Sequence, residues 1–284
     1  MITGGQFSVV ISRWGGSRQG EAKINVASAI SLDCIEELFI DRLEWQRQVF
    51  WDDREGRVVA REERRLGALI LASRPVQVSQ EEAVSAALEG IRRVGLEALN
   101  WTAEASRLVA RVRFVERTFP KEGWPDFTPG TLLDSLELWL GPFLSNVRSW
   151  SDLARLDLVG PLRASLEWSQ QKFLDELAPT HLPVPSGSRI ALDYQTENNP
   201  ILAVKLQELF GLAETPRVAG GRVPVLLHLL SPARRPIQVT QNLRSFWDEI
   251  YPEVKKELKG RYSKHPWPDD PWSAAPTRWT KKRK

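Results

Sequence analysis

The chain has 284 residues, of which 42% are hydrophobic and 9% aromatic, enough apolar material for more than one buried core. Its 39 Lys and Arg against 36 Asp and Glu give a formal net charge of +3, which is too small to indicate nucleic acid by itself. No apolar run approaches the roughly 20 residues that span a bilayer, and no basic segment followed by an apolar core begins the chain. We therefore expect a cytoplasmic protein without membrane contact.

The single cysteine, Cys34, has no second cysteine in the sequence with which to form a disulfide. It falls in a short helix predicted over residues 32–39, which Ser31 caps and which places Ile35 and Leu38 on one apolar face. Because a free cysteine behaves as a small hydrophobe, we expect Cys34 to be buried.

Residues 1–76 have strand character. Short runs rich in β-branched and aromatic residues are separated by the turn signals GGSRQG and DDREG, a pattern typical of a small sheet or barrel. The runs cover residues 7–14, 21–30, 43–51, 56–62 and 66–73.

Residues 79–177 have the pattern of a helical bundle. Ser79 and Glu82 form a capping box that opens one helix, and Gly95 ends it. The next helix is predicted to turn its arginines, Arg111 among them, away from its apolar stripe. Tryptophans at apolar positions of these helices are expected to pack in the core. They are Trp101, Trp139, Trp150 and Trp168.

Residues 178–262 combine strands and helices. The predicted strands cover residues 188–195, 201–206, 223–232 and 235–241. The last three are apolar enough to be covered on both faces of a sheet. A longer helix, interrupted by Pro252, follows them. Residues 263–284 contain too many prolines for a helix or strand, so we expect an extended tail that docks through its tryptophans or stays disordered.

Motifs for catalysis are absent from these 284 residues. There is no G-x-x-x-x-G-K-[ST] loop to hold phosphates and no D-E-x-H motif to hold metal and water. The three histidines have no second ligand at metal-binding spacing. Asp193 and Glu208 are carboxylates of the kind that share a metal in nucleases, but a turn or capping role explains each. Ser186–Gly187 and Gly220–Gly221 are predicted to be turns.

Basic residues give a better lead to function. Arginines at predicted turns beside apolar strands could reach phosphates without disturbing a sheet. The terminal run TRWTKKRK either binds polyanions through counterion release or solubilises the chain end. Arg61, Arg64 and Arg65 alternate with acids, and a solvated face explains them as well as a binding face does. The candidate nucleic-acid-binding residues are Arg189, Arg222, Arg234, Arg235, Lys281, Lys282, Arg283 and Lys284.

Several long stretches resemble one protein family. They are LAPTHLPVPSGSRIALDY over 177–194, LQELFGLAETPRVAGGRVPVLLHLLSPARRPIQVTQ over 206–241, GRYSKHPWPDDPW over 260–272 and the segment 41–76. Together they resemble the C-terminal region, and the part just before it, of the HrpB family of bacterial DExH-box ATP-dependent helicases. In that family two RecA-like domains hydrolyse ATP, and none of their ATP-site residues matches a position here. Winged-helix, helical-bundle and OB-like elements of the family help to guide nucleic acid.

The resemblance also predicts that residues 1–76 are the later strands of an OB-like barrel. Further strands precede them in the family, so the barrel is expected to be incomplete and to present an open edge near Phe7 to Ile11. A truncated gene product, the second half of a split gene, or a domain completed by a partner's strand would each account for this.

The sequence therefore predicts an α+β, multi-domain protein. Its parts are an OB-like β segment over 1–76, a helical segment over 79–177, a mixed α/β domain over 178–262 and a tail over 263–284. The predicted function is that of a nucleic-acid-binding accessory region of an HrpB-like helicase, which binds RNA or single-stranded DNA without cofactor, metal or NTPase activity. Two alternatives stay open: a scaffold that docks on a separately encoded helicase motor or another protein, and, more remotely, a metal-dependent enzyme.

Overall fold

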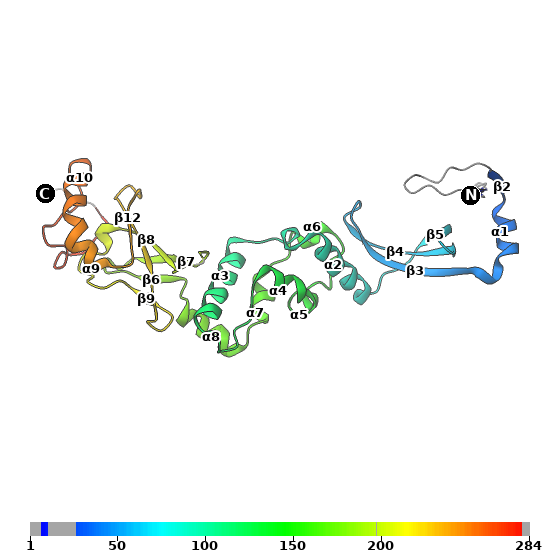
Figure 1. The fold of residues 1–284 in the computed structure, drawn as a ribbon, viewed down its shortest axis with the longest axis horizontal. Coiled ribbons are helices and arrows are strands. Elements are labelled where there is room, and N and C mark those ends of the chain that lie inside the picture. Colours follow the sequence, from blue (N-terminus) through cyan, green and yellow to red (C-terminus); the bar gives the residue numbers. More distant parts are fainter. Residues whose placement is uncertain (1–6, 11–26, 197, 280–284) are drawn as a thin grey trace, which may run out of the picture. The chain divides into compact units, whose positions relative to one another are not determined.

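The computed structural model describes residues 7–10, 27–196 and 198–279 (Figure 1). It contains helices and several sheets, so the α+β prediction is confirmed. The chain folds into two compact units. The first unit comprises residues 1–93 and 144–152, and the second comprises residues 94–143 and 153–284. The division into four predicted segments stays a prediction.

The first unit contains two antiparallel ladders. In the smaller one, β1 (Phe7–Val10) pairs with β2 (Ala27–Ile30). The larger is a meander whose strands are β3 (Leu43–Asp52), β4 (Arg57–Leu66) and β5 (Leu69–Pro75). Gly56 and Gly67 have positive φ in its two turns, where a side chain would be strained. The described strands close no barrel, so the OB-like barrel stays a prediction; Ile11, at its expected edge, lies outside the described residues.

The short helix predicted near Cys34 is present as α1 (Leu32–Leu38). Ser31 caps it by accepting a hydrogen bond from the amide of Cys34, and the turn η1 (Ile40–Arg42) leads on to β3. Ile35 is the buried residue of this helix, whereas Leu38 is 69% exposed. Cys34 is exposed, so the prediction that it is buried is wrong. A helix of two turns has room for one inward position, and Ile35 takes it.

The helix α2 (Gln80–Val94) packs against β3 within the first unit. Its predicted capping box is confirmed, because Ser79 and Glu82 exchange backbone-to-side-chain hydrogen bonds. Glu82 also accepts a hydrogen bond of 2.7 Å from Nε of Arg47 on β3. At the other end, Arg93 donates to the Trp51 carbonyl at 2.9 Å. Charged groups therefore hold both ends of α2 to the same strand.

Close packing of a tryptophan on a glycine joins α2 to β3. Trp51 is 1% exposed, and a Cβ built on Gly90 would lie 2.5 Å from its ring. Residues 144–152 close this core: Trp150 contacts the Trp51 ring edge-on at 4.6 Å, and its amide donates to the Gly56 carbonyl. Trp150 begins α6 (Trp150–Leu153). Only glycine at position 90 lets the indole approach the helix this closely.

Helices form the first part of the second unit. The longest is α3 (Ala103–Thr118), which Thr102 caps and which packs against α7 and α8. Trp139 is buried as predicted, but Trp168 is 80% exposed, so its expected core position is wrong. Trp168 is the first residue of its helix, before the stripe that faces the core begins. The other elements are η2 (Leu96–Ala98), α4 (Pro129–Asp134), α5 (Leu136–Trp139), η3 (Gly141–Phe143), α7 (Val159–Ala164) and α8 (Trp168–Leu177).

The arginine at the centre of α3 lies inside the unit. Arg111 is buried, so the prediction that it faces away from the apolar stripe is wrong. Its Nε donates to the carbonyl oxygen of Ala178 at 2.6 Å, and its Nη2 donates to the carbonyl of Leu174 and to a carboxylate oxygen of Asp175. The guanidinium thus satisfies the Ala178 carbonyl, which no other described donor reaches, and adds a second donor to the Leu174 carbonyl, which already accepts from the Ala178 amide.

A five-stranded sheet in the order β12-β11-β8-β7-β6 forms the second part of this unit. Only β8 and β11 run parallel. Alternate residues of these two strands are buried, and no residue of β12 is buried, so the prediction that both faces are covered is wrong. The strands are β6 (His181–Pro183), β7 (Arg189–Asp193), β8 (Ile201–Lys205), β11 (Leu226–Leu230) and β12 (Pro236–Thr240). A small ladder of β9 (Arg217–Val218) and β10 (Val223–Pro224) precedes β11.

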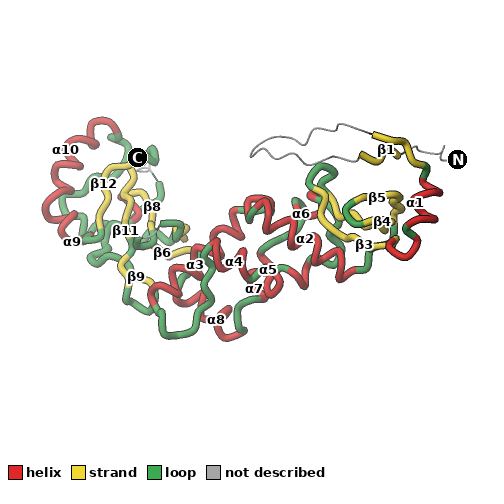
Figure 2. The backbone as a smooth tube through the Cα atoms, turned by 45° about the vertical axis from the view of Figure 1, so that its right-hand side comes forward, coloured by secondary structure: helices red, strands yellow, loops and turns green. Residues whose placement is uncertain are grey.

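The C-terminal helices lie beside the sheet on the side of β12, as both views show (Figure 2). They are α9 (Leu243–Ser245), the π-helical η5 (Phe246–Ile250) and α10 (Tyr251–Arg261). The tail docks on this unit as far as the structure describes it. Trp267 is buried, the amide of Gly211 donates to the Pro271 carbonyl, and the amide of Thr277 donates to the carbonyl of Gln207.

Candidate nucleic-acid interface

Strand directions place three of the predicted arginines at one end of the five-stranded sheet. Because β8 and β11 are parallel, they finish at the same end, where Lys205 is the last residue of β8. Antiparallel β7 begins there with Arg189, and the turn from β11 to antiparallel β12 carries Arg234 and Arg235. We call residues 184–189, 205–208 and 231–235 the carboxyl edge.

The carboxyl edge presents its cations across several strands. Arg189, Arg234 and Arg235 are exposed and Lys205 is half-buried. Strands β7 and β12 stand three positions apart in the sheet, so their ends are separated by about 14 Å at about 4.8 Å per strand. Ligands of open sheets commonly bind outside the carboxyl ends of parallel strands. These four cations therefore lie along one end of the sheet, at the end where its parallel pair of strands finishes.

A buried carboxylate supports the turn that carries Arg189. Glu208, in the turn η4 (Leu206–Glu208), accepts hydrogen bonds from the hydroxyl groups of Ser186 and Ser188 at 2.8 and 2.5 Å. Gly187, with φ of 79°, completes the turn, as the sequence predicted for Ser186–Gly187. These contacts fix the start of β7, and so the backbone from which the Arg189 side chain extends.

The turn between β11 and β12 is equally well defined. Ser231 is buried, its amide donates to the Arg235 carbonyl, and its hydroxyl accepts from the Arg235 amide. Arg234 has φ of 60°, in the left-handed region. Neither Arg234 nor Arg235 forms an ion pair with a residue that the structure describes. Both guanidinium groups are available to a ligand.

The docked tail adds groups to the carboxyl edge. His265 forms a hydrogen bond of 2.7 Å between Nδ1 and Oε1 of Gln207; burial lowers the pKa of His265, and the charge of Lys205 adds to the effect. Nη2 of Arg278 lies against Gly187, 3.4 Å from the place a Cβ would occupy. Lys205 was not among the predicted site residues, although it lies next to the end of a predicted strand. The predicted residues Lys281, Lys282, Arg283 and Lys284 lie outside the described part of the chain.

Arg222 lies at the other end of the sheet. It is exposed in the turn between β9 and β10, and its guanidinium stacks 4.6 Å from the centre of the Phe119 ring. The turn itself is the predicted one, with positive φ at Gly220 and Gly221. The structure therefore brings Arg189, Arg234 and Arg235 to one edge and places Arg222 away from them.

The arginines of β4, in the first unit, are held by acids. Arg61 and Arg65 both pair with Glu63, which is 1% exposed, and Arg64 pairs with Glu36. Ion pairs of this kind stabilise the fold of the first unit. They leave these guanidinium groups less available to a phosphate than those of the carboxyl edge.

The carboxylates considered as metal ligands have local roles. Asp193 accepts a hydrogen bond from the amide of Gln195, as expected of a turn residue, and Glu208 is held by two serines. Among the described residues, no three His, Cys, Asp or Glu side chains gather where they could hold a metal ion. None of the described helices combines the length and apolar character needed to cross a bilayer.

Comparisons with known proteins agree on one family. The model for the ATP-dependent helicase C-terminal region of HrpB matches residues 139–271, and the model for the connector region of the ATP-dependent RNA helicase HrpB matches residues 42–76. The ATP-dependent RNA helicase HrpB of Escherichia coli is 44% identical over 268 residues, which are 94% of this chain and 33% of that protein.

The chain belongs to the HrpB family.

Solved structures of HrpB share its fold. A crystal structure of the E. coli DExH-box NTPase HrpB superposes with a TM-score of 0.71 at 43% identity, covering 94% of this chain and 33% of that one. A crystal structure of the E. coli DEAH/RHA helicase HrpB gives a TM-score of 0.62 at 43% identity, covering 80% and 29%. The chain thus spans about a third of the length of the HrpB relative it matches, and what it matches is the connector and C-terminal region.

Proposed function

We propose that this chain is a nucleic-acid-binding accessory region of an HrpB-like ATP-dependent helicase and acts in the cytoplasm. The observation that carries the proposal is the carboxyl edge, where exposed Arg189, Arg234 and Arg235 and half-buried Lys205 project from well-defined strand ends. Guanidinium groups bind phosphate through paired N–H donors, and such contacts hold a strand without reading its sequence.

The ligand proposed is a single strand, and RNA in the first place. The relative from E. coli is described as an ATP-dependent RNA helicase, which supports RNA as the choice. A strand crossing from β7 to β12 would pass Arg189, Lys205 and Arg235 in turn. The proposed contact is therefore with consecutive phosphates, and little sequence preference is expected.

The same proposal includes the absence of NTPase activity from this chain. Its 284 residues contain neither a phosphate-binding G-x-x-x-x-G-K-[ST] loop nor a D-E-x-H motif. Purified chain is expected to hydrolyse ATP no faster than a no-enzyme control, with or without RNA. Saturable turnover stimulated by RNA, retained through stringent purification, would overturn this part.

A docking role is the second candidate, and the first unit favours it. Leu38 and Ile40 are 69% and 67% exposed, and Leu69, at the adjacent end of the meander, is 59% exposed. Apolar side chains gathered in this way suit contact with a helicase motor. For residues 1–76 we retain the OB-like proposal, which the antiparallel meander supports.

Salt-dependent binding of a fluorescent single-stranded RNA tests the proposal. The magnitude of the slope of log K against log salt should fall by about 0.7 for each phosphate that the protein no longer neutralises. The double variant Arg234→Ala, Arg235→Ala should thus lower it by about 1.4, and deletion of the four cations in residues 280–284 by up to about 2.8.

A matched control removes the same charge from the other end of the sheet. Arg222→Ala with Arg244→Ala deletes two exposed cations that no strand on the carboxyl edge would contact. Its slope should stay within about 0.3 of the parent's, well under the effect of one phosphate. If both double variants lowered the magnitude of the salt slope equally, the proposed interface would be refuted and docking favoured. The same conclusion would follow if the parent chain showed no salt-dependent RNA binding at low salt.

A further inference from the structure

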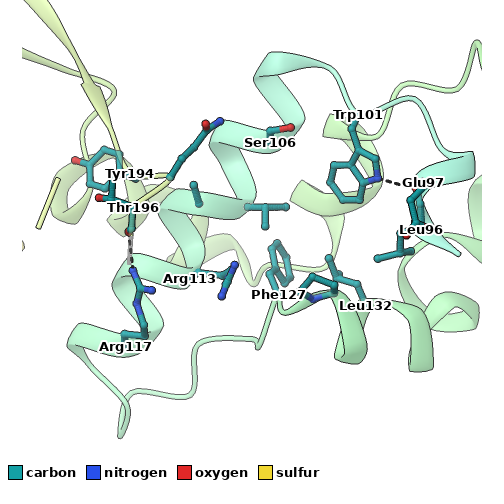
Figure 3. Close-up of a pocket in the computed structure, with 14 residues that line it drawn as sticks. Leu96, Glu97, Trp101, Ser106, Arg113, Arg117, Phe127, Leu132, Tyr194 and Thr196 are labelled. Carbon is teal, nitrogen blue, oxygen red and sulfur yellow. Dashed lines mark hydrogen bonds between the residues drawn. The ribbon is translucent and has the colours of Figure 1, made fainter. Parts of the chain in front are cut away.

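A cavity in the second unit lies apart from the carboxyl edge. It has a volume of about 410 Å³, opens to solvent, and is lined by η2, α3, α4 and the residues that follow β7 (Figure 3). The strand directions place the segment after β7 at the end of the sheet opposite the carboxyl edge. Pockets of roughly 300 to 1,000 Å³ are the size at which proteins bind small ligands.

One part of the cavity wall is mainly aromatic and aliphatic, with Glu97 beside it. Trp101 and Leu96 lie at one end, and Phe127 and Leu132 lie between that end and the arginines (Figure 3). The indole of Trp101 is held in place, because its Nε1 donates a hydrogen bond of 2.9 Å to the Leu96 carbonyl. A fixed, half-buried indole offers a flat apolar surface to a ring, and bases stack on such surfaces whatever their sequence.

The other part of the wall is cationic. Arg113 and Arg117 are four residues apart on α3, so they project from the same side of the helix into the cavity. Nη2 of Arg117 reaches the Thr196 carbonyl only at 3.5 Å, and Arg113 donates no hydrogen bond to a described residue. Both guanidinium groups keep N–H donors for a ligand anion.

The balance of charge at this end still favours an anion. Asp126 lies near enough to Arg113 for the positive charge to contribute to its lowered pKa, although hydrogen bonds from Thr131 and Thr128 contribute more. The C-terminal end of α3 adds about half a negative charge. At the arginine end, two guanidinium charges exceed the sum of one carboxylate and this helix end. The other carboxylate of the cavity wall, Glu97, lies at the Trp101 end (Figure 3).

We propose that this cavity binds a single nucleotide, with the base against Trp101 and the phosphate on Arg113 and Arg117. The chemistry required is a flat ring joined to an anion, and the cavity has an aromatic wall at one end and two arginines toward the other (Figure 3). Two sources supply such a group: a free mononucleotide, or one nucleotide of a bound strand. The inference stands on the cavity and does not depend on the carboxyl edge.

Equilibrium dialysis of the full chain with AMP, ribose 5-phosphate and a five-nucleotide RNA tests the inference. AMP should bind at least about tenfold more tightly than ribose 5-phosphate, which lacks the base. The double variant Arg113→Gln, Arg117→Gln should weaken AMP binding by more than about tenfold. Ala110→Leu, which extends a side chain from the cavity wall without changing either arginine, should weaken it similarly.

Controls separate this site from the carboxyl edge and from loss of folding. Arg107→Gln changes an exposed arginine of α3 that does not line the cavity, and Arg234→Ala with Arg235→Ala changes only the edge. Both should bind AMP as the parent does, and all variants should keep the parent's circular dichroism. If the five-nucleotide RNA binds more tightly than AMP, and the cavity variants weaken the binding of both, the ligand is one nucleotide of a bound strand.

Three results would overturn the inference. Ribose 5-phosphate binding as tightly as AMP would show that no base is recognised. AMP and RNA binding unchanged in folded Arg113→Gln, Arg117→Gln and Ala110→Leu variants would show that the ligand lies elsewhere. An equal loss of AMP binding in the Arg107→Gln control would show that general charge, and not the cavity, is responsible.

Discussion

Replacing Arg111 by methionine should destabilise the second unit by about 2–4 kcal/mol. Methionine keeps most of the buried volume, so the effect reports the hydrogen bonds that the guanidinium makes. The largest part is the Ala178 carbonyl: Ala178 is fully buried, and removal of the 2.6 Å bond from Nε leaves its oxygen without that donor. An unsatisfied buried acceptor costs about 1–3 kcal/mol. The longer bond to Leu174 at 3.2 Å adds less.

The ion pair with Asp175 should contribute little to this cost. The Asp175 side chain is 73% exposed, although Nη2 of Arg111 approaches it at 2.5 Å, and exposed pairs contribute about 0–1 kcal/mol. Asp175→Asn should therefore cost less than about 1 kcal/mol, and a double-mutant cycle should give a coupling of the same size. Urea unfolding, with amide exchange in α8 identifying the second unit, measures both variants. Equal costs for Arg111→Met and Asp175→Asn would refute the argument that carbonyl satisfaction dominates.

Three further predictions concern single groups. Hydrogen bonds from Arg47 lower the pKa of Glu82 to about 2. The ionised Glu82 carboxylate therefore stabilises the fold fully above its unfolded pKa of about 4.3, and this stabilisation is lost as pH falls toward 2. Carbon NMR of the Glu82 carboxyl group should show the lowered titration midpoint, and Arg47→Gln should raise it. Because burial lowers the pKa of His265, folding favours its neutral form, so the protection factors of the tail amides, which are corrected for the pH dependence of intrinsic exchange, should fall below pH of about 6.5. Protection factors that do not change with pH would contradict this. In urea unfolding, Gly90→Ala should destabilise by about 1–2 kcal/mol because it meets the buried indole of β3, whereas Gly260→Ala, in open space on α10, should be neutral or stabilising.

The sequence predicted local structure well where a short signal sufficed. The capping box at Ser79 and the turn at Gly187 follow from neighbouring residues, and both are present. Burial was predicted less well because it depends on partners far along the chain. Arg111 is buried by α8, more than 60 residues later, and Cys34 is exposed because the single inward position of a two-turn helix goes to Ile35.

Prediction of the site likewise succeeded for local features and failed for those that depend on contacts far along the chain. Periodicity and composition marked arginines at strand ends, but they did not give the strand order. Only the parallel pairing of β8 with β11 shows that Arg189 and Arg235 share an edge with Lys205 and that Arg222 does not. The cavity on α3 was not predicted, because Trp101 and Arg117 are 16 positions apart and line one cavity only together with residues of α4 and of the segment after β7.

Amide hydrogen exchange of the chain with and without single-stranded RNA is the decisive measurement for the carboxyl edge. We predict slower exchange on binding in the turns at 184–189 and 231–235, and no change in the turn at 219–222, since the carboxyl edge carries the proposed phosphate contacts. Slower exchange at 219–222 with none at the carboxyl edge, or no change in either at an RNA concentration that saturates binding, would contradict the proposed interface.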